Sequence, residues 1–449
     1  MIAASEAGIC TMTTRLESGT GNATLALVPH AERDAVLNEL HARPFEAVTS
    51  PCRAIRFAFL TDAAQMNANA EALTRYCTTH RLADLSATAK HRRIAFPGAI
   101  LRWEQHSEFT TYTWLLEGAA GDEGDRSDEA APPPLIAAAM NEIGQPGAHL
   151  VSIDLHVAGG DTPDLARLFD PSSLAASDVL GGHATIATDF QVDDNGFVRF
   201  LLQNHGLASV ETGGLVLRIL EIETYRCFAL LGLPQAHRIM PVIRNAEDRL
   251  THIMTVMTNG GSGLETNREL LDEITSLAAR VEADAAIAGY RFAASAAYDD
   301  IVRQRLEVIG EKPLGGWPTL AEFLGRRLNP AMRTCQTLNT RMHDLNKKLT
   351  RAANLLRTRI DVEIEQQNRD LLAAMSERAR MQLRLQQTVE GLSVAAISYY
   401  VASLLHYVFE SAEHYLPVSA TVATGISIPF VVIVLAVLLW RVKRGHGHA

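Results

Sequence analysis

The sequence has few cysteines, and none in the paired spacing of a metal or redox centre. Only five occur in 449 residues, and no two of them form a CxxC pair. This excludes a disulfide framework, a zinc ribbon and a thioredoxin-type centre, so we expect a reducing, cytoplasmic setting for most of the chain. The first residues also lack a basic stretch followed by an apolar run, which predicts no secretory signal.

The sequence motifs of common enzyme classes are absent as well. There is no GxSxG nucleophile elbow, no P-loop, no GxGxxG after a strand and no HExxH. We find no internal repeat. The sequence therefore predicts a non-enzymatic protein and indicates no particular cofactor.

Positive charge is in the minority over the whole chain. Lys and Arg number 41 against 51 Asp and Glu, for a formal charge of -10. This excludes a globally basic nucleic-acid binder. The charge is unevenly spread, because acidic residues predominate in 1–325 and basic residues in 326–384. An acidic body joined to a basic stalk is the pattern expected beside anionic lipid headgroups.

Two long uncharged runs, residues 392–409 and 418–440, lie near the C-terminus. Each is long enough to cross about 30 Å of hydrocarbon at about 1.5 Å per residue. We therefore predict two transmembrane helices, joined by an external loop at 410–417 and followed by a tail at 441–449. Basic residues flank the pair on both sides and the loop contains none, so both termini are predicted to be cytoplasmic. The lipid bilayer, as a bacterial inner membrane, is the first expected partner.

A polar stripe follows the first of these runs. Tyr399, Ser403, His406 and Glu410 recur at spacings of three or four and so share one helical face. In lipid such a face must meet protein or water. It either packs against the second run or a neighbouring subunit, or lines a pore formed by several copies. In the external loop, Glu413 and His414 could concentrate cations at the mouth of such a pore.

The basic stalk has a helical period, with apolar residues every three or four positions from Leu338 to Met375. No Gly or Pro occurs from Ala331 to Glu390, so we predict one helix over 331–391, on the order of 90 Å long. A helix of that length needs a partner. The partner is either the helix-like stretch 264–311, connected through a turn and a short helix in 312–330, or another subunit. Self-association is therefore expected.

The front of the chain alternates strand-like and helix-like segments, which predicts an N-terminal α/β domain within an α+β membrane protein. Asp194-Asn195-Gly196 predicts a β-hairpin turn. We place a disordered N-terminus at 1–27, the α/β domain at 28–210 with an acidic flexible insertion at 118–134, and a helical region at 211–330. Strands are predicted at 53–60, 98–105, 108–116, 149–157, 183–192 and 196–203, and helices near 31–41, 64–81 and 215–231.

One predicted strand carries candidate metal ligands. If the strand stays extended, Arg102, Glu104, His106 and Glu108 point to one face. Glu and His side chains so spaced could bind a divalent cation. The alternative is a sheet face crossed by charge pairs, and the same choice applies to Asp154 with His156.

Several long segments resemble one known family. The chain from about 28 to 442 is similar to bacterial membrane-anchored proteins grouped under domain of unknown function 3422. The resemblance implies membrane anchoring and carries no established activity, and the insertion at 118–134 looks like a variable part. It rests on NELHARPF (38–45), LRWEQHSEF (101–109), LEIETYRCFALLGLP (220–234), YRFAASAAYDDIV (290–302) and QLRLQQTVEGLSVAAISYY (382–400).

The architecture also resembles CorA-type divalent cation transporters, which are pentamers. The Gly-Met-Asn signature of that family is missing, and His406 to Glu410 stand in its place. Three hypotheses remain: a membrane-anchored, non-enzymatic, oligomeric scaffold or sensor; a CorA-like ion conduit lined by the polar stripe; and a metal-dependent enzyme that uses the strand-face carboxylates and histidines.

Overall fold

The computed structural model describes residues 29–33, 46–85, 90–118, 132–259, 263–412 and 418–445. The predictions for 1–27, most of the insertion at 118–134, most of the helix at 31–41, and the loop residues Glu413 and His414 lie outside these ranges. The chain divides into two compact units. One comprises Met1–Arg238 with Ile287–Asn339, and the other Ile239–Ala286 with Thr340–Ala449.

The first unit is built on one ten-stranded sheet, ordered β10-β7-β8-β9-β6-β1-β5-β4-β3-β2. Every described pairing is antiparallel except β6 with β9. The fold is therefore mixed α+β rather than a parallel α/β sheet. The strands are β1 Cys52–Leu60, β2 Ala83–Asp84, β3 His91–Phe96, β4 Ala99–Gln105, β5 Phe109–Glu117, β6 Ala148–Gly159, β7 Ala175–Val179, β8 Ala184–Thr188, β9 Val198–Asn204 and β10 Lys312–Pro313.

All six predicted strands are present, as β1, β4, β5, β6, β8 and β9. The predicted hairpin joins β8 to β9, but its turn differs from the expected one. The N–H of Gly196 donates to the carbonyl of Asp193 at 2.9 Å. Among the turn residues only Gly196 has a positive φ, of 85°, so Asn195 does not adopt the left-handed conformation. The Asp193 carboxylate accepts from the N–H groups of Asn195 and Phe197 and holds the turn.

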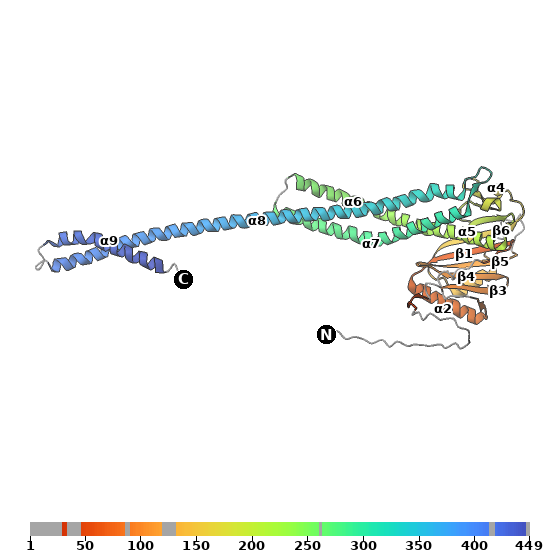
Figure 1. The fold of residues 1–449 in the computed structure, drawn as a ribbon, viewed down its shortest axis with the longest axis horizontal. Coiled ribbons are helices and arrows are strands. Elements are labelled where there is room, and N and C mark those ends of the chain that lie inside the picture. Colours follow the sequence, from red (N-terminus) through yellow and green to blue (C-terminus); the bar gives the residue numbers. More distant parts are fainter. Residues whose placement is uncertain are drawn as a thin grey trace, which may run out of the picture. The chain divides into compact units, whose positions relative to one another are not determined.

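Strand alternation sorts the core onto two faces of the sheet. In β1, Ala54 and Ala58 face the core under helix α5 (Ser209–Leu230), together with parts of α7 and α8. Ile55 and Phe59 face the core under α2 (Ala63–His80) and α3 (Pro134–Ile143). Figure 1 shows α2 and α5 on opposite sides of the sheet. A smaller cluster packs the short helix α4 (Leu165–Leu168) against β7, β8 and β9.

The remaining helices are α6 (Gly232–Thr258), α7 (Leu264–Ile309), α8 (Leu320–Ser411) and α9 (Ala420–Gly445). In the second unit α6, α7 and α8 pack along a buried stripe. The stalk prediction is confirmed over its first part, because the predicted apolar positions up to Ile360 are buried, whereas Leu371 and Met375 are exposed. The buried positions are Met342, Leu345, Leu349, Ala352, Leu356 and Ile360 of α8, facing Ile243, Ala246, Leu250, Ile253 and Met257 of α6 and Leu270, Ile274, Leu277 and Val281 of α7.

Helix α8 begins eleven residues earlier than the stalk predicted at 331–391, so the predicted turn and short helix at 312–330 need correcting. A capping box starts it, in which Thr319 Oγ1 accepts from the N–H of Glu322 and Glu322 Oε2 accepts from the N–H of Thr319. Pro330 then lies inside the helix. Its missing N–H removes one helical hydrogen bond, and the buried Leu324 and Leu328 anchor the turns before it. As predicted, the helix runs unbroken into the first apolar run.

Candidate functional site

The end of α8 and helix α9 are long and apolar enough to cross a membrane. The apolar window of neither helix is buried within the structure. Large apolar side chains such as Leu404, Ile426 and Phe430 are each more than 60% exposed. A soluble protein rarely leaves so many exposed together, and these two helices form a hairpin with an exposed apolar surface.

One polar contact joins the two helices of the hairpin. Nδ1 of His406 lies 3.0 Å from Oγ1 of Thr424. The Thr424 hydroxyl donates to the carbonyl of Ala420 at 2.7 Å, so its oxygen accepts from His406. Tyr399 is 70% exposed, and Glu410 is also exposed. The residues of the predicted stripe therefore differ in their surroundings. His406 faces α9, whereas Tyr399 and Glu410 are exposed.

Thr424 was missed by the sequence reasoning. The available signal was a hydroxyl inside the second apolar run, which in lipid needs a hydrogen-bonding partner on its own or a neighbouring helix. Ser403 is half-buried. Within the described residues, His406 is thus the member of the stripe with a side-chain partner on the second apolar helix.

The metal candidates lie elsewhere, beneath α5. Strand β4 ends at Gln105, and the N–H of His106 donates to the carbonyl of Phe109 at 2.8 Å to close the connection to β5. The extended strand assumed for these residues therefore stops before His106. Arg102 and Glu104 do share one face, as predicted. His106 stacks on Phe109, with ring centroids 4.1 Å apart.

Glu104 is enclosed by two guanidinium groups and an imidazole. Arg102 Nη2 donates to its Oε1 at 2.9 Å, and Arg56 Nη2 and His91 Nδ1 each lie 3.7 Å from one of its oxygens. Burial alone would raise the pKa of Glu104, but His91 and the charges of Arg102 and Arg56 outweigh it and hold this pKa well below its usual range. Glu104 is therefore a buried anion already neutralised by the protein.

The space beside Glu104 is too small for a substrate. The cavity that Arg56, Glu104, His106 and Tyr225 help to line has a volume of about 10 Å³, enough for about one water molecule. Among the described residues no group of three or more His, Cys, Asp or Glu side chains could hold a metal ion. With two guanidinium groups against its one carboxylate, this cluster is arranged as a structural ion network.

Asp154 has a similar structural setting. Nε and Nη2 of Arg53 donate to its two oxygens at 2.9 Å each, and His156 Nε2 lies 3.3 Å away. The pairing joins β1 to β6 in the middle of the sheet. Bidentate guanidinium–carboxylate pairs of this kind fix geometry.

Glu108 is held by α7 instead of a metal. Arg291 donates to both its oxygens, at 2.9 and 2.7 Å, and the Tyr298 hydroxyl donates at 2.8 Å. Burial would raise the pKa of Glu108, but the hydrogen bonds from Arg291 and Tyr298 outweigh it and lower this pKa. The sequence reasoning missed both partners. Their spacing of seven, which places them on one helical face, was the available signal.

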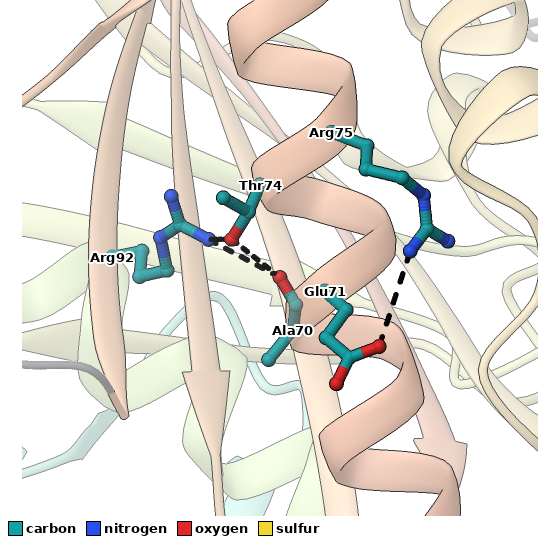
Figure 2. A pocket seen from close by; sticks show the side chains of 5 residues that line it. All are labelled: Ala70, Glu71, Thr74, Arg75 and Arg92. Carbon is teal, nitrogen blue, oxygen red and sulfur yellow. Dashed lines mark hydrogen bonds and ion pairs between the residues drawn. The ribbon is translucent and has the colours of Figure 1, made fainter.

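Helix α2 and strand β3 border an open pocket of about 480 Å³ (Figure 2). Arg92 donates there from Nη1 to Oγ1 of Thr74 at 2.8 Å, and its Nη2 pairs with Asp84 at 2.5 Å. Glu71 and Arg75 form an exposed pair at 3.9 Å on the same helix. Arg92 is thus held by structural partners, and the Glu71–Arg75 pair is exposed to solvent.

A family model described as "Protein of unknown function (DUF3422)" matches residues 28–446. No curated protein and no solved structure matches the sequence. The similarity to CorA-type transporters therefore finds no support in these comparisons.

Proposed function

Because the chain belongs to the DUF3422 family, whose description names no activity, we propose from the structure that it is a membrane-anchored, non-enzymatic scaffold. In this proposal the apolar hairpin of α8 and α9 inserts into the bacterial inner membrane, and the sheet-containing unit is displayed in the cytoplasm to bind a partner. The exposed apolar surface of the two hairpin helices is the observation that carries the proposal.

The energetics favour insertion. Leu, Ile, Val and Phe each contribute about -0.3 to -0.6 kcal/mol when placed at the centre of a membrane helix, and these residues dominate α9. The His406–Thr424 contact satisfies a polar pair between the two helices, as expected for packing inside a bilayer. This contact supports an anchor over a pore, since a pore-lining histidine would face away from its own hairpin partner.

The flanking charges support an orientation with both ends in the cytoplasm. Arg378, Arg380 and Arg384 precede the first apolar run, and Arg441 follows the second. Basic residues beside spanning helices remain on the cytoplasmic side. The same residues can contact anionic headgroups, at about 1 kcal/mol each near the surface.

The proposal includes self-association through α8. Every residue from 365 to 389 of this helix is exposed, including Leu371, Leu372 and Met375 at about 60% each. A solvent-exposed helix with an apolar face gains stability by packing against another. A second copy anchored in the same membrane presents this face in parallel orientation, and it is the partner that we propose.

Membrane extraction tests the anchor. Membranes from cells that produce the full-length protein are washed with alkaline carbonate and then with detergent, and the protein should resist the first and dissolve in the second. Replacing Ile426 and Phe430 together with Arg should move the protein to the soluble or aggregated fraction. Leu85→Arg is the matched control, because this exposed apolar residue lies in the sheet unit. Extraction of the wild type by carbonate alone would contradict the proposal.

A further inference from the structure

His406 lies inside the apolar hairpin, and its contact with Thr424 determines which ring nitrogen carries the hydrogen. The Thr424 hydroxyl donates its only hydrogen to the carbonyl of Ala420. Its oxygen therefore accepts from Nδ1 of His406, and a neutral imidazole that donates through Nδ1 carries a lone pair on Nε2. Within the described parts of the chain, Nε2 has no hydrogen-bond partner. It keeps accessible surface, because it is not among the buried polar atoms that lack a partner.

An imidazole held in this way is arranged as a metal ligand. Metal-ligating histidines donate their second ring N–H to an oxygen of the protein, and this donation fixes the tautomer and the direction of the ring. A lone pair placed in lipid also needs a partner, since polar groups there are unfavourable without one. The partner of Nε2 is therefore either a metal ion or a hydroxyl group of another helix.

A carboxylate lies one helical turn away. Glu410 follows His406 by four residues on α8 and is exposed. Side chains at this spacing have Cβ atoms about 5–6 Å apart, so both can reach one ion. In the proposed orientation His406 lies about 5 Å inside the outer end of the first apolar run, and Glu410 follows directly after that end. An ion from the outer water meets the carboxylate first and the imidazole one turn deeper.

One chain supplies too few ligands to close a metal site here. Among the described residues no group of three or more His, Cys, Asp or Glu side chains could hold a metal ion. A closed zinc site takes four ligands. Two copies that each contribute His406 and Glu410 supply that number.

The face proposed for self-association continues along α8 to these two residues. His406 follows Leu371, and Glu410 follows Met375, by 35 positions each, which is five whole heptads. The helix is unbroken over this length. Parallel helices that pair through a seven-residue repeat supercoil, and equivalent heptad positions then stay at the seam. Two copies joined through Leu371 and Met375 therefore bring both His406 and both Glu410 side chains to one seam.

The residues between Leu371 and His406 suit such a seam. Leu385, Leu392 and Tyr399 repeat the heptad position of Leu371, and Arg378 is the charged residue among them. A single polar residue at a core position fixes the register of paired helices at a cost in stability. Arg378 therefore favours the in-register pair that the shared site requires.

We propose that two copies of the chain together bind one divalent transition-metal ion, through Nε2 of His406 and the carboxylate of Glu410 from each copy. Zn²⁺ suits imidazole and carboxylate ligands, whereas Mg²⁺ prefers oxygen ligands in octahedral geometry. Thr424 is a positioning residue, because it acts on the ion only through Nδ1 of His406. The site rests on the proposed membrane anchor and on the pairing through α8, and it adds a ligand to them.

A metal titration tests the site. The full-length protein is purified in detergent without a histidine tag and without metal, and it is titrated with Co²⁺. Four nitrogen and oxygen ligands give Co²⁺ a visible absorption band that the free ion shows only weakly. We expect saturation at one ion for two chains, displacement by Zn²⁺ and no displacement by Mg²⁺.

Variants of the site separate ligands from the positioning residue. His406→Ala and Glu410→Gln should each weaken Co²⁺ binding at least tenfold. Thr424→Val replaces the hydroxyl by a methyl group and leaves both ligands in place, so it should weaken binding about tenfold and shift the absorption band. Thr424→Ser keeps the hydroxyl and should restore both the affinity and the band.

Two further variants lie outside the site. Leu371→Glu combined with Met375→Glu should weaken binding by separating the copies, although it changes no ligand. The matched control replaces His446 and His448 in the tail with Ala. Loss of these two histidines should leave the affinity and the stoichiometry unchanged.

The outcomes that would overturn the proposal are distinct from a failure of the anchor. Equal binding by wild type and His406→Ala, a preference for Mg²⁺, or saturation at one ion per chain would overturn it. Absence of binding together with a lower native mass of His406→Ala would assign Nε2 to a hydroxyl of the second copy instead. A protein that resists carbonate but binds no Co²⁺ refutes this site alone, whereas extraction by carbonate contradicts the scaffold itself.

Discussion

Replacing Glu108 with Gln tests whether the pairing of β5 with α7 stabilises the first unit. The change removes the charge that Arg291 and Tyr298 hold through three hydrogen bonds of 2.9 Å or less. Breaking a fully buried pair costs about 3–5 kcal/mol. The Arg291 side chain is 19% exposed and can turn towards water, so we expect a loss of about 2–3 kcal/mol.

Thermal unfolding in detergent measures this loss. The fluorescence of the buried Trp103 and Trp114 reports on the sheet. At about 2–4 °C per kcal/mol, the midpoint should fall by about 4–12 °C. Glu71→Gln is the control, because Glu71 and Arg75 are both more than 70% exposed, and such pairs contribute about 0–1 kcal/mol.

The pH dependence gives a second readout. The pKa of Glu108 is lower in the folded protein than in the unfolded chain. Its contribution is therefore present above the unfolded pKa, about 4.3, and is lost as the pH falls through the folded pKa. The difference between wild type and Glu108→Gln should narrow on acidification. If Glu108→Gln and Arg291→Met destabilise additively in a double-mutant cycle, the two residues are not coupled and the reasoning is refuted.

Three more predictions address the helices. Gly213→Ala should destabilise the fold by more than about 3 kcal/mol, because its Cβ would lie 1.7 Å from a backbone carbonyl oxygen. The Cβ of Gly289→Ala would meet nothing within 4 Å, so this change should stabilise the fold by about 0.5–1 kcal/mol. Similar shifts of the melting temperature in the two variants would contradict this prediction. Replacing Leu371 and Met375 with Glu should lower the native mass of the detergent-solubilised protein, and an unchanged mass excludes self-association through this face. Proteoliposomes carrying wild-type or His406→Ala protein should show the same cation flux, and a difference would favour a conduit.

Local sequence patterns were enough to predict those helices and strands whose residue types match their surroundings in the fold. β-Branched and aromatic alternation predicted β1, β5 and β6, and the apolar period predicted the buried face of α8. Strands β3 and β7 were missed for physical reasons. β3 opens with His91, Arg92 and Arg93, and β7 is built largely from small residues. Both are strands because neighbouring strands pair with them, which no local pattern records.

The candidate site was less accessible to sequence reasoning. Alternation correctly placed Arg102 and Glu104 on one face, but it could not show that this face is covered by α5. Glu108 and Arg291 are 183 positions apart. The local pattern around each residue shows which face of its strand or helix it lies on, but not which residue it contacts. An isolated strand therefore suggested metal ligands, whereas the packed sheet uses the same carboxylates as ion-pair acceptors.

The sheet ends at both edges in strands of two residues, β2 and β10. One of the two residues of β10 is Pro313, which has no N–H to donate. A peptide that added itself as an eleventh strand would find almost no backbone to pair with. The described sheet thus resists both edge-to-edge aggregation and recognition by strand addition. A protein that docks on this unit is left with side chains rather than a free strand edge, and a partner search should favour folded surfaces over extended peptides.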